Sequence, residues 1–436
     1  MKKLLTVLLV LAMVMGLTAC GKKNQHEAVD HGEATIWYTY TKGQETYLLK
    51  AVEDFNASQD KFKITATSQS NQGFADSVYQ AVMAKNGPDI IIDYASTAAT
   101  YVEDNKVIAL DEYLSEDLQK ALSAGAKEEA TSFEDGKMHV FPIVFSGPVL
   151  FYNPELLEAA GVAVPTNWDE VYEASKVINQ LFVWTTTEND KVVYHVAKED
   201  PGVAGTKHPW GFAVDSPTDV LQSMIMQNGV EIWDNNAKEC KFADPKVYAA
   251  LDWYGKGCQE GLFLSNPTLD NYFSSDYNAY NIAMYVGSVA GSPYLSAPWD
   301  VAPMPQTKGG KEWTPAWNRG VMIFNYDDEA RAQAAAAFLE YFAKPEVNAG
   351  WCEACNYMTA LTTTQDNATY KAFLGNGTDA VKALLALRPE SAGSFIAVPA
   401  IQYVRNALKN AMADAAAGVS GEQAVKNAIE YVNDQL

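Results

Sequence analysis

The sequence predicts an α/β protein of two lobes, and three observations lead to this prediction. The chain has 436 residues, which is more than one hydrophobic core usually holds. Strand and helix patterns alternate over residues 34–94 in the order βαβαβ, which indicates a parallel sheet. The run HVFPIVFSGPVLFYN at residues 139–153 contains two strands too apolar for a surface position, with a polar break between them.

The polar break is Ser146-Gly147-Pro148. Gly147 frees the backbone, whereas Pro148 lacks an N–H and restrains the residue before it. We interpret the break as a chain crossing between two bodies, where the Ser146 hydroxyl would face a cleft. A core strand with a β-bulge is the alternative that this stretch leaves open.

The N-terminus has the features of an export signal. Lys2 and Lys3 precede the apolar residues 4–15, a run too short to span a bilayer comfortably. The following LTAC, ending at Cys20, resembles a bacterial lipobox, which predicts a signal peptide over residues 1–19 and a lipidated Cys20. Ordinary signal cleavage nearby, with Cys20 incidental, is the alternative.

A flexible tether is predicted over residues 20–33, and no later stretch approaches about 20 apolar residues. We therefore expect a soluble body held by a lipid anchor on the outer face of the cell membrane. Four potential metal ligands lie in the tether, and we interpret them as solvated linker residues: His26, Glu27, Asp30 and His31.

The chain is acidic, with a net charge of −22. Removing Lys2 and Lys3 from the 32 basic residues, against 54 acidic ones, makes the charge −24. Such a charge argues against nucleic acid and anionic lipid surfaces as partners. Four further cysteines allow three disulfide pairings or free thiols, and the sequence leaves the choice open: Cys240, Cys258, Cys352 and Cys355.

The first lobe begins with strands predicted at residues 34–40, 61–69 and 89–94. Helices are predicted between them, over residues 44–56 and 74–85, from apolar residues at helical spacing. In a parallel sheet the loops after the strands share one edge, so we expect ligand-facing residues near 38–42, 68–73 and 93–97. Tyr38 and Tyr40 are candidates there.

A second βα series follows the central stretch. Asn167 before Trp168-Asp169-Glu170 predicts a helix start with a capping box. Residues 185–205 are polar and indicate an insertion or hairpin. Further strands are predicted at residues 210–213 and 281–288, with helices over 218–227 and 245–257.

The proline-rich residues 299–305 suit a second crossing rather than a central strand. A strand at residues 321–324 then precedes a helix that Asp327 or Asp328 caps and that runs to Phe342. Two helices end the chain, one starting at Pro399 and one at Ser420.

No metalloprotease, nucleophile-elbow, P-loop or dinucleotide motif is present, so the sequence offers no catalytic residues, metal ligands or cofactor site. A pair of acidic residues would serve a glycosidase, but 54 of them make a pair uninformative without geometry. Most of the aromatic residues are assigned to the core. The loop aromatics are candidates for stacking on a sugar: Trp210, Trp233, Tyr272 and Trp317.

Five segments carry a resemblance to a known family: FSGPVLFYNPELLEAAGVAVPTNWDEV, NAYNIAMYVGSVA, PAWNRGVMIF, FLEYFAKPEVNAGWCEACNYMTA and VPAIQYVRNALKNAM. Together they resemble the extracellular solute-binding proteins of carbohydrate ABC transporters. The resemblance covers residues 34–436 and is closest to the branch of the glycerol-3-phosphate-binding protein. It implies a maltose-binding-protein-like (type II) fold, with three crossings near 143–146, 302–305 and 358–363. The N-lobe would then hold residues 34–143 and 305–358, and the C-lobe residues 146–302 and 363–436.

The resemblance also implies site residues. Ser146, Ser288, Gly320 and Tyr357 match cleft positions of that branch. Three positions depart from it: Asn71 replaces an aromatic residue, Ala95 an acid and Gln402 an arginine. Arg319 and Arg405 are the nearby arginines that would hold a phosphate instead, although ion pairing is an equally good interpretation of them.

We therefore expect a monomeric binding protein that delivers a solute to an ABC permease. A neutral sugar or polyol is favoured over glycerol-3-phosphate or a glycerophosphodiester, because the branch arginine is missing. The alternatives of another class are a surface-anchored glycosidase and an adhesin or structural lipoprotein.

Overall fold

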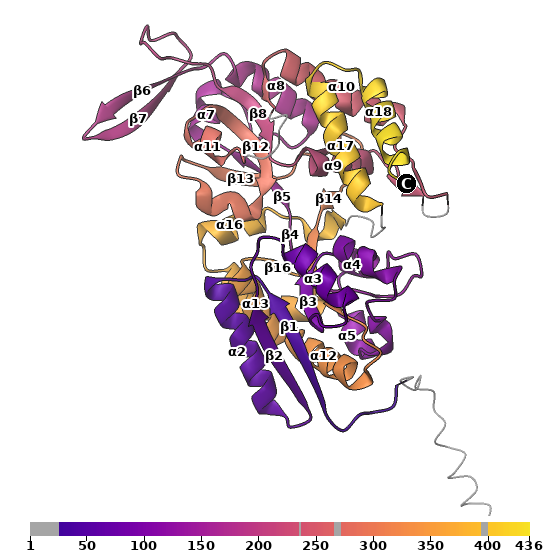
Figure 1. Ribbon diagram of the computed structural model, residues 1–436. Helices are drawn as coiled ribbons and strands as arrows, with labels where there is room; N and C mark the ends of the chain where they lie inside the picture. Colours follow the sequence, from indigo (N-terminus) through magenta and orange to yellow (C-terminus); the bar gives the residue numbers. More distant parts are fainter. Residues whose placement is uncertain (1–25, 235–236, 266–271, 394–399) are drawn as a thin grey trace, which may run out of the picture.

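The computed structural model describes residues 26–234, 237–265, 272–393 and 400–436, which form two lobes (Figure 1). The predicted signal peptide and the predicted lipidation site Cys20 lie outside the described residues. The N-lobe sheet has six strands in the order β16-β4-β15-β3-β1-β2, and the C-lobe sheet has five in the order β11-β8-β12-β5-β13. Helices surround both sheets, as expected for the predicted two-lobed α/β fold.

The N-lobe is assembled from two parts of the chain. Its elements are β1 (Gly32–Tyr38), α2 (Lys42–Ser58), β2 (Phe62–Ser68), α3 (Phe74–Met83), β3 (Ile90–Asp93), α4 (Ala95–Val102), η1 (Leu110–Glu112), α5 (Glu116–Lys120), α6 (Ala124–Ala130), β4 (Phe141–Ser146), β15 (Trp317–Ile323), α12 (Glu329–Phe342), α13 (Pro345–Cys355), β16 (Met358–Thr359), α14 (Thr362–Gln365) and α15 (Ala368–Leu374).

The predicted βαβαβ unit is confirmed. β1 pairs in parallel with β2 and β3, and α2 buries the apolar stripe that predicted it, from Leu48 to Phe55. β15 lies between β3 and β4 and is antiparallel to both, so the N-lobe sheet is mixed.

The C-lobe contains the second βα series. Its elements are β5 (Pro148–Tyr152), α7 (Pro154–Ala160), α8 (Trp168–Ile178), β6 (Phe182–Glu188), β7 (Lys191–Ala197), β8 (Trp210–Val214), α9 (Pro217–Gln227), β9 (Trp233–Asp234), β10 (Glu239–Cys240), α10 (Pro245–Gln259), β11 (Phe263–Leu264), α11 (Ser274–Asn278), β12 (Ile282–Ser288), η2 (Val289–Tyr294), β13 (Asp300–Pro303), α16 (Asp379–Leu385), α17 (Ile401–Ala416) and α18 (Gly421–Asn433).

Local signals in the sequence account for several boundaries. The Asn167 side chain accepts a hydrogen bond from the Glu170 N–H at 3.0 Å, and Glu170 accepts one from the Thr166 N–H at 2.8 Å, which closes the N-terminus of α8. Ser420 caps α18 and Asp328 caps α12. Residues 182–197 form the β6–β7 hairpin, which projects from the C-lobe in Figure 1.

One residue separates the two sheets at the polar break. Ser146 pairs with Trp317 in the N-lobe sheet, and Pro148 pairs with Ser288 in the C-lobe sheet, so the chain changes lobe at Gly147. A Cβ atom at Gly147 would lie 2.7 Å from the Pro315 carbonyl oxygen. The crossing interpretation therefore holds, and glycine is needed because two crossing segments touch there.

The other connections also run between the sheets. The second connection leads from β13 in the C-lobe to β15 in the N-lobe and contains β14 (Thr314–Pro315). β14 pairs in parallel with β17 (Ala392–Gly393), which follows η3 (Pro389–Ser391) in the chain. The third crossing differs from the prediction near 358–363, because β16 pairs with β4 and α15 packs on α13. The chain leaves the N-lobe between α15 and α16, which packs on η2, so residues 362–374 belong to the N-lobe.

The described part of the predicted tether lies against the N-lobe. His26 stacks on Tyr113, with ring centres 4.1 Å apart, and its Nδ1 lies 3.1 Å from Glu329 Oε2. Gln333 on α12 binds this segment twice, accepting from the Val29 N–H and donating to the Glu27 carbonyl. β1 then starts at Gly32. The prediction of a free tether up to residue 33 therefore fails for residues 26–33, because these contacts hold the backbone.

The state of the cysteines and the length of the helices can be read from the described residues. Cys240, Cys258, Cys352 and Cys355 are free thiols, and the last two are buried on α13. Within the described ranges, each helix is too short or too polar to span a membrane.

Candidate functional site

A cavity of about 540 Å³ lies between the lobes, where the carboxyl ends of strands from both sheets meet. Its lining combines aromatic rings, serine hydroxyls and two carboxylates. The residues are Tyr94, Ser146, Pro148, Asp215, Ser216, Asp219, Tyr272, Val286, Gly287, Ser288, Trp317 and Tyr357.

A second cavity of about 390 Å³ shares Tyr94, Asp219 and Trp317 with the first. It extends the cleft toward α4 on the N-lobe and α17 on the C-lobe. Its other lining residues are Ser96, Thr97, Glu129, Ala316, Asn318, Gln402 and Arg405.

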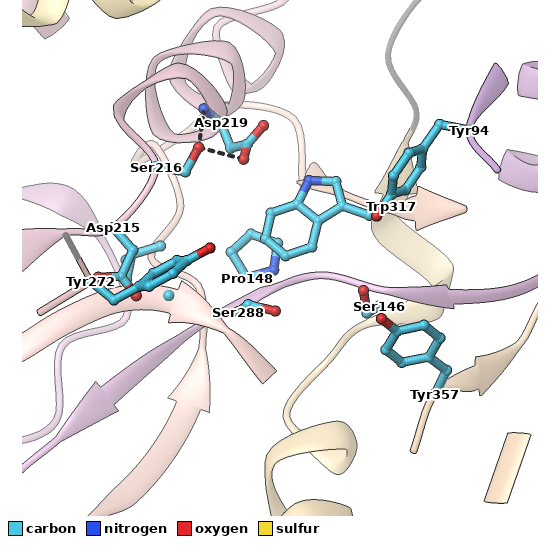
Figure 2. Close-up of a pocket in the computed structure, with 12 residues that line it drawn as sticks. Tyr94, Ser146, Pro148, Asp215, Ser216, Asp219, Tyr272, Ser288, Trp317 and Tyr357 are labelled. Carbon is cyan, nitrogen blue, oxygen red and sulfur yellow. Dashed lines mark hydrogen bonds between the residues drawn. The ribbon is translucent and has the colours of Figure 1, made fainter. Parts of the chain in front are cut away.

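Trp317 occupies the middle of the cleft. Figure 2 shows its indole with Asp215 and Tyr272 on one side and Tyr94 on the other. β15 positions Trp317 by pairing it with Ser146, the last residue of the N-lobe sheet before the crossing. Flat rings of this kind offer apolar faces on which the ring of a solute can stack.

The C-lobe wall carries the acidic groups. Asp219, in the first turn of α9, accepts a hydrogen bond from the Ser216 hydroxyl at 2.6 Å and lies 3.3 Å from Arg405 Nη1. Asp215 directly follows β8, and its Oδ1 accepts the Phe273 N–H at 2.8 Å. Burial raises the pKa of Asp215 to about 6, because a carboxylate is less stable away from water.

The N-lobe wall includes a half-buried cation behind the lining. Arg319 Nε donates a hydrogen bond to the Tyr94 hydroxyl at 3.2 Å. Burial raises the pKa of Asp93, which ends β3. The hydrogen bond that Asp93 accepts from the Tyr94 N–H and the charge of Arg319 oppose this rise. Asn318 donates a hydrogen bond to the buried Glu129. Arg319 thus lies behind the cleft surface, whereas Glu129 lines the smaller cavity.

Seven residues singled out from the sequence line the two cavities. Ser146, Tyr272, Ser288, Trp317 and Tyr357 line the larger one, and Gln402 and Arg405 line the smaller one. Arg319 lies outside both linings and donates a hydrogen bond to Tyr94, which belongs to both.

Seven other candidates lie outside both linings. Tyr38 and Tyr40 are buried, and Tyr40 packs edge-on against Trp351. Trp210 begins β8, at the end remote from Asp215, and Trp233 lies in the small β9–β10 hairpin.

The remaining three have other surroundings. Asn71 is exposed in the loop after β2, and Ala95 is buried at the start of α4. A Cβ atom at Gly320 would lie 2.3 Å from Val140 Cγ1, so this glycine allows close strand packing at an irregular point of β15.

Tyr94, Asp215 and Asp219 line the cleft but were not among the individual residues predicted from the sequence. Tyr94 and Asp215 each come directly after a strand, and Tyr94 lies within the predicted ligand-facing residues 93–97. Asp215 could have been found by applying the same strand-end rule to residues 210–213. Asp219 gave no signal, because an acid in the first turn of a helix is commonplace.

The described residues contain no cluster of three or more His, Cys, Asp and Glu side chains able to hold a metal ion. The residues that line the cleft offer aromatic rings for stacking, hydroxyls and carboxylates. These are the groups that bind a hydroxylated small molecule.

The fold and this cleft define a two-lobed binding protein. Solved structures of other binding proteins share the fold. The cyclic α-maltosyl-1,6-maltose binding protein from Arthrobacter globiformis is 19% identical, with a TM-score of 0.76, over 93% of this chain and 98% of that chain. The GacH receptor of Streptomyces glaucescens, solved unliganded and with acarbose, is 17% identical, with a TM-score of 0.69, over the same shares of both chains.

The family model of bacterial extracellular solute-binding proteins matches residues 50–373. The chain belongs to this family. Among curated relatives, the sn-glycerol-3-phosphate-binding periplasmic protein UgpB of Rhizobium meliloti is 27% identical over 184 residues, which are 36% of this chain and 41% of the relative. UgpB of Agrobacterium fabrum is 27% identical over 210 residues, 40% of this chain and 45% of the relative. The chain thus spans less than half the length of these relatives.

Proposed function

We propose that this protein captures a sugar or polyol-type solute between its lobes, outside the cell, and delivers it to an ABC permease. The observation that carries the proposal is the composition of the cleft. Both lobes contribute to one cavity, and its centre is an indole surrounded by hydroxyl and carboxylate groups. Ring faces stack on the apolar faces of a sugar, while the polar groups bind its hydroxyls.

The side chains that line the cleft can provide the affinity that such a protein needs. A micromolar Kd requires about −8 kcal/mol. Stacking on Trp317, together with hydrogen bonds to Ser146, Ser288 and Asp219, is sufficient in a cleft that closes over the solute.

The proposal includes the location of the protein. Its mature form begins at a lipidated Cys20 and acts as a monomer on the outer face of the cell membrane. The export signal and the membership of an extracellular family support this location. Nucleic acid and catalysis have no part in the proposed activity.

Calorimetric titration with mono- and oligosaccharides and polyols tests the proposal. We expect at least one solute to bind with micromolar affinity, change Trp fluorescence and compact the protein in small-angle scattering. The proposal is wrong if solutes of this class change neither the Trp fluorescence nor the scattering while a solute of another class closes the lobes.

The second candidate solute is sn-glycerol-3-phosphate or a glycerophosphodiester, which the UgpB relatives favour. A phosphate needs unpaired cationic donors, but Arg405 pairs with Asp219, and Arg319 lies behind Tyr94. We therefore favour the sugar or polyol. Micromolar binding of phosphate esters that Arg405→Gln abolishes would reverse this choice.

A surface glycosidase is the candidate of another class, because Asp215 and Asp219 line one cavity. In a glycosidase of this kind, turnover would require both carboxylates. Incubation with glycoside substrates should release no reducing sugar, and release that Asp219→Asn removes would establish the enzyme instead.

A further inference from the structure

The larger cavity has an unbalanced charge. Among the residues that line it, the charged ones are Asp215 and Asp219, and no Lys, Arg or His lines it within the part of the chain that the structure describes. Asp219 is already balanced, because Arg405 lies 3.3 Å away and Ser216 donates a hydrogen bond to it. The uncompensated charge therefore resides on Asp215.

Asp215 has one oxygen available. Its Oδ1 accepts the Phe273 N–H, whereas Oδ2 has no hydrogen-bond or ion-pair partner among the described residues. Gly287 on β12 gives this oxygen room, since a Cβ atom there would lie 2.5 Å from Oδ2. Substitution of Gly287 would thus push the carboxylate out of its present position.

Aromatic rings face the same space. Trp317 and Tyr272 line the cavity with Asp215, and Tyr94 and Tyr357 complete the set (Figure 2). The faces of such rings carry negative potential and attract cations. A partly buried carboxylate in a cavity lined by aromatic rings is therefore a site that favours positive charge.

A neutral hydroxyl would also donate to Asp215, but it would leave the charge of the carboxylate uncompensated. A protonated amine donates the hydrogen bond and neutralises the charge at once. We propose that the solute carries a protonated amine on its hydroxylated ring, as an amino sugar or amino polyol does, and that Asp215 receives this amine. The inference rests on the proposed function and names the chemical class of its solute.

Titration with matched saccharides tests the inference. The probes are mono- and disaccharides of several linkages that contain glucosamine, each paired with its glucose and N-acetylglucosamine counterparts. We expect the amine form to bind at least about tenfold more tightly than either counterpart at about pH 7. Asp215→Asn should abolish this preference, while Asp169→Asn, which removes an exposed charge from α8 of the same lobe, should leave it unchanged.

Wild-type protein gives a readout that needs no variant. Asp215 accepts the Phe273 N–H and lies close to the Tyr285 ring, and it shares the cavity lining with Tyr272 and with Asp219, whose partner is Arg405. Because burial raises the pKa of Asp215 to about 6, acidification from about pH 7 to about pH 5 protonates it while the amine stays charged. The preference for the amine should therefore fall several-fold.

Three outcomes would overturn the inference, and they can be told apart. If the glucose or N-acetylglucosamine form binds as tightly as the amine form, the inference fails while the proposed function stands. If no saccharide binds and a solute of another class closes the cleft, both fail. A preference that survives Asp215→Asn, with the variant folded by circular dichroism, would also overturn it.

Discussion

Arg319 donates a hydrogen bond from Nε to the Tyr94 hydroxyl at 3.2 Å, and its guanidinium carbon lies 5.2 Å from the centre of the Tyr94 ring. Tyr94 lines both cavities, whereas Arg319 lines neither. The arginine thus positions a wall of the cleft from behind it.

A double-mutant cycle on Tyr94→Phe and Arg319→Gln should reveal this coupling. A hydrogen bond that involves a charged group contributes roughly 1.5–3 kcal/mol, so we expect a coupling free energy of about 1–2 kcal/mol in urea unfolding. Tyr79→Phe on the exposed face of α3 is the control and should change little. Strictly additive effects would show that the two side chains act independently.

Trp317→Ala should weaken solute binding by at least about tenfold with the fold intact, because it removes the central stacking face. Trp210→Ala is the matched control, since Trp210 lies at the opposite end of β8 from the cleft. Calorimetry with the solute that the wild-type protein binds most tightly measures the affinity of each variant, and circular dichroism checks its fold. Equal losses of affinity in both variants would argue against a site at Trp317.

Asp215 should make the empty protein less stable at neutral pH. An aspartate in an unfolded chain has a pKa of about 3.9. Burial raises the pKa of Asp215 to about 6 in the folded protein, so the unfolded chain loses this proton first as the pH rises. The contribution of Asp215 to the free energy of unfolding should therefore fall between about pH 4 and about pH 6, by up to about 3 kcal/mol. We expect Asp215→Asn to raise the melting temperature at pH 7 but not at pH 4. A lower melting temperature at pH 7 would contradict the assigned burial cost.

Gly147→Ala should disturb the crossing. The new methyl group would lie 2.7 Å from the Pro315 carbonyl oxygen and 3.1 Å from Leu387 Cδ2, so the crossing segments must separate. We expect a loss of about 1–3 kcal/mol in the free energy of unfolding. Small-angle scattering should show altered lobe separation. Gly43→Ala is the control, because a Cβ atom there meets nothing within 4 Å.

Gln333→Ala should release the N-terminal segment, since Gln333 binds both the Val29 N–H and the Glu27 carbonyl. Hydrogen exchange of the Val29 amide should accelerate, whereas exchange within β1 should stay slow. Unchanged protection of Val29 would mean that the His26 contacts hold the segment alone.

Strands, helices and caps could be predicted from the sequence, because periodicity and capping residues act locally. Ser146 and Trp317 could also be placed near the cleft, the first from the polar break and the second as a loop aromatic. Trp210 was misplaced, because strand direction, and not loop position, decides which end of β8 faces the other lobe. The partnership of Asp219 with Arg405, 186 residues apart, depends on tertiary packing that no local pattern reports.

The attachment of residues 26–29 to α12 would restrict how a protein anchored at Cys20 stands on a membrane. Residues 21–25 separate Cys20 from His26, so the Cα atoms of these two residues lie at most about 21 Å apart at full extension. An anchor at Cys20 would therefore hold the N-lobe close to the lipid headgroups in a narrow range of orientations. Opening and closing would then be a movement of the C-lobe above a nearly stationary N-lobe, and a permease in the same membrane would meet the same face of the N-lobe in both states.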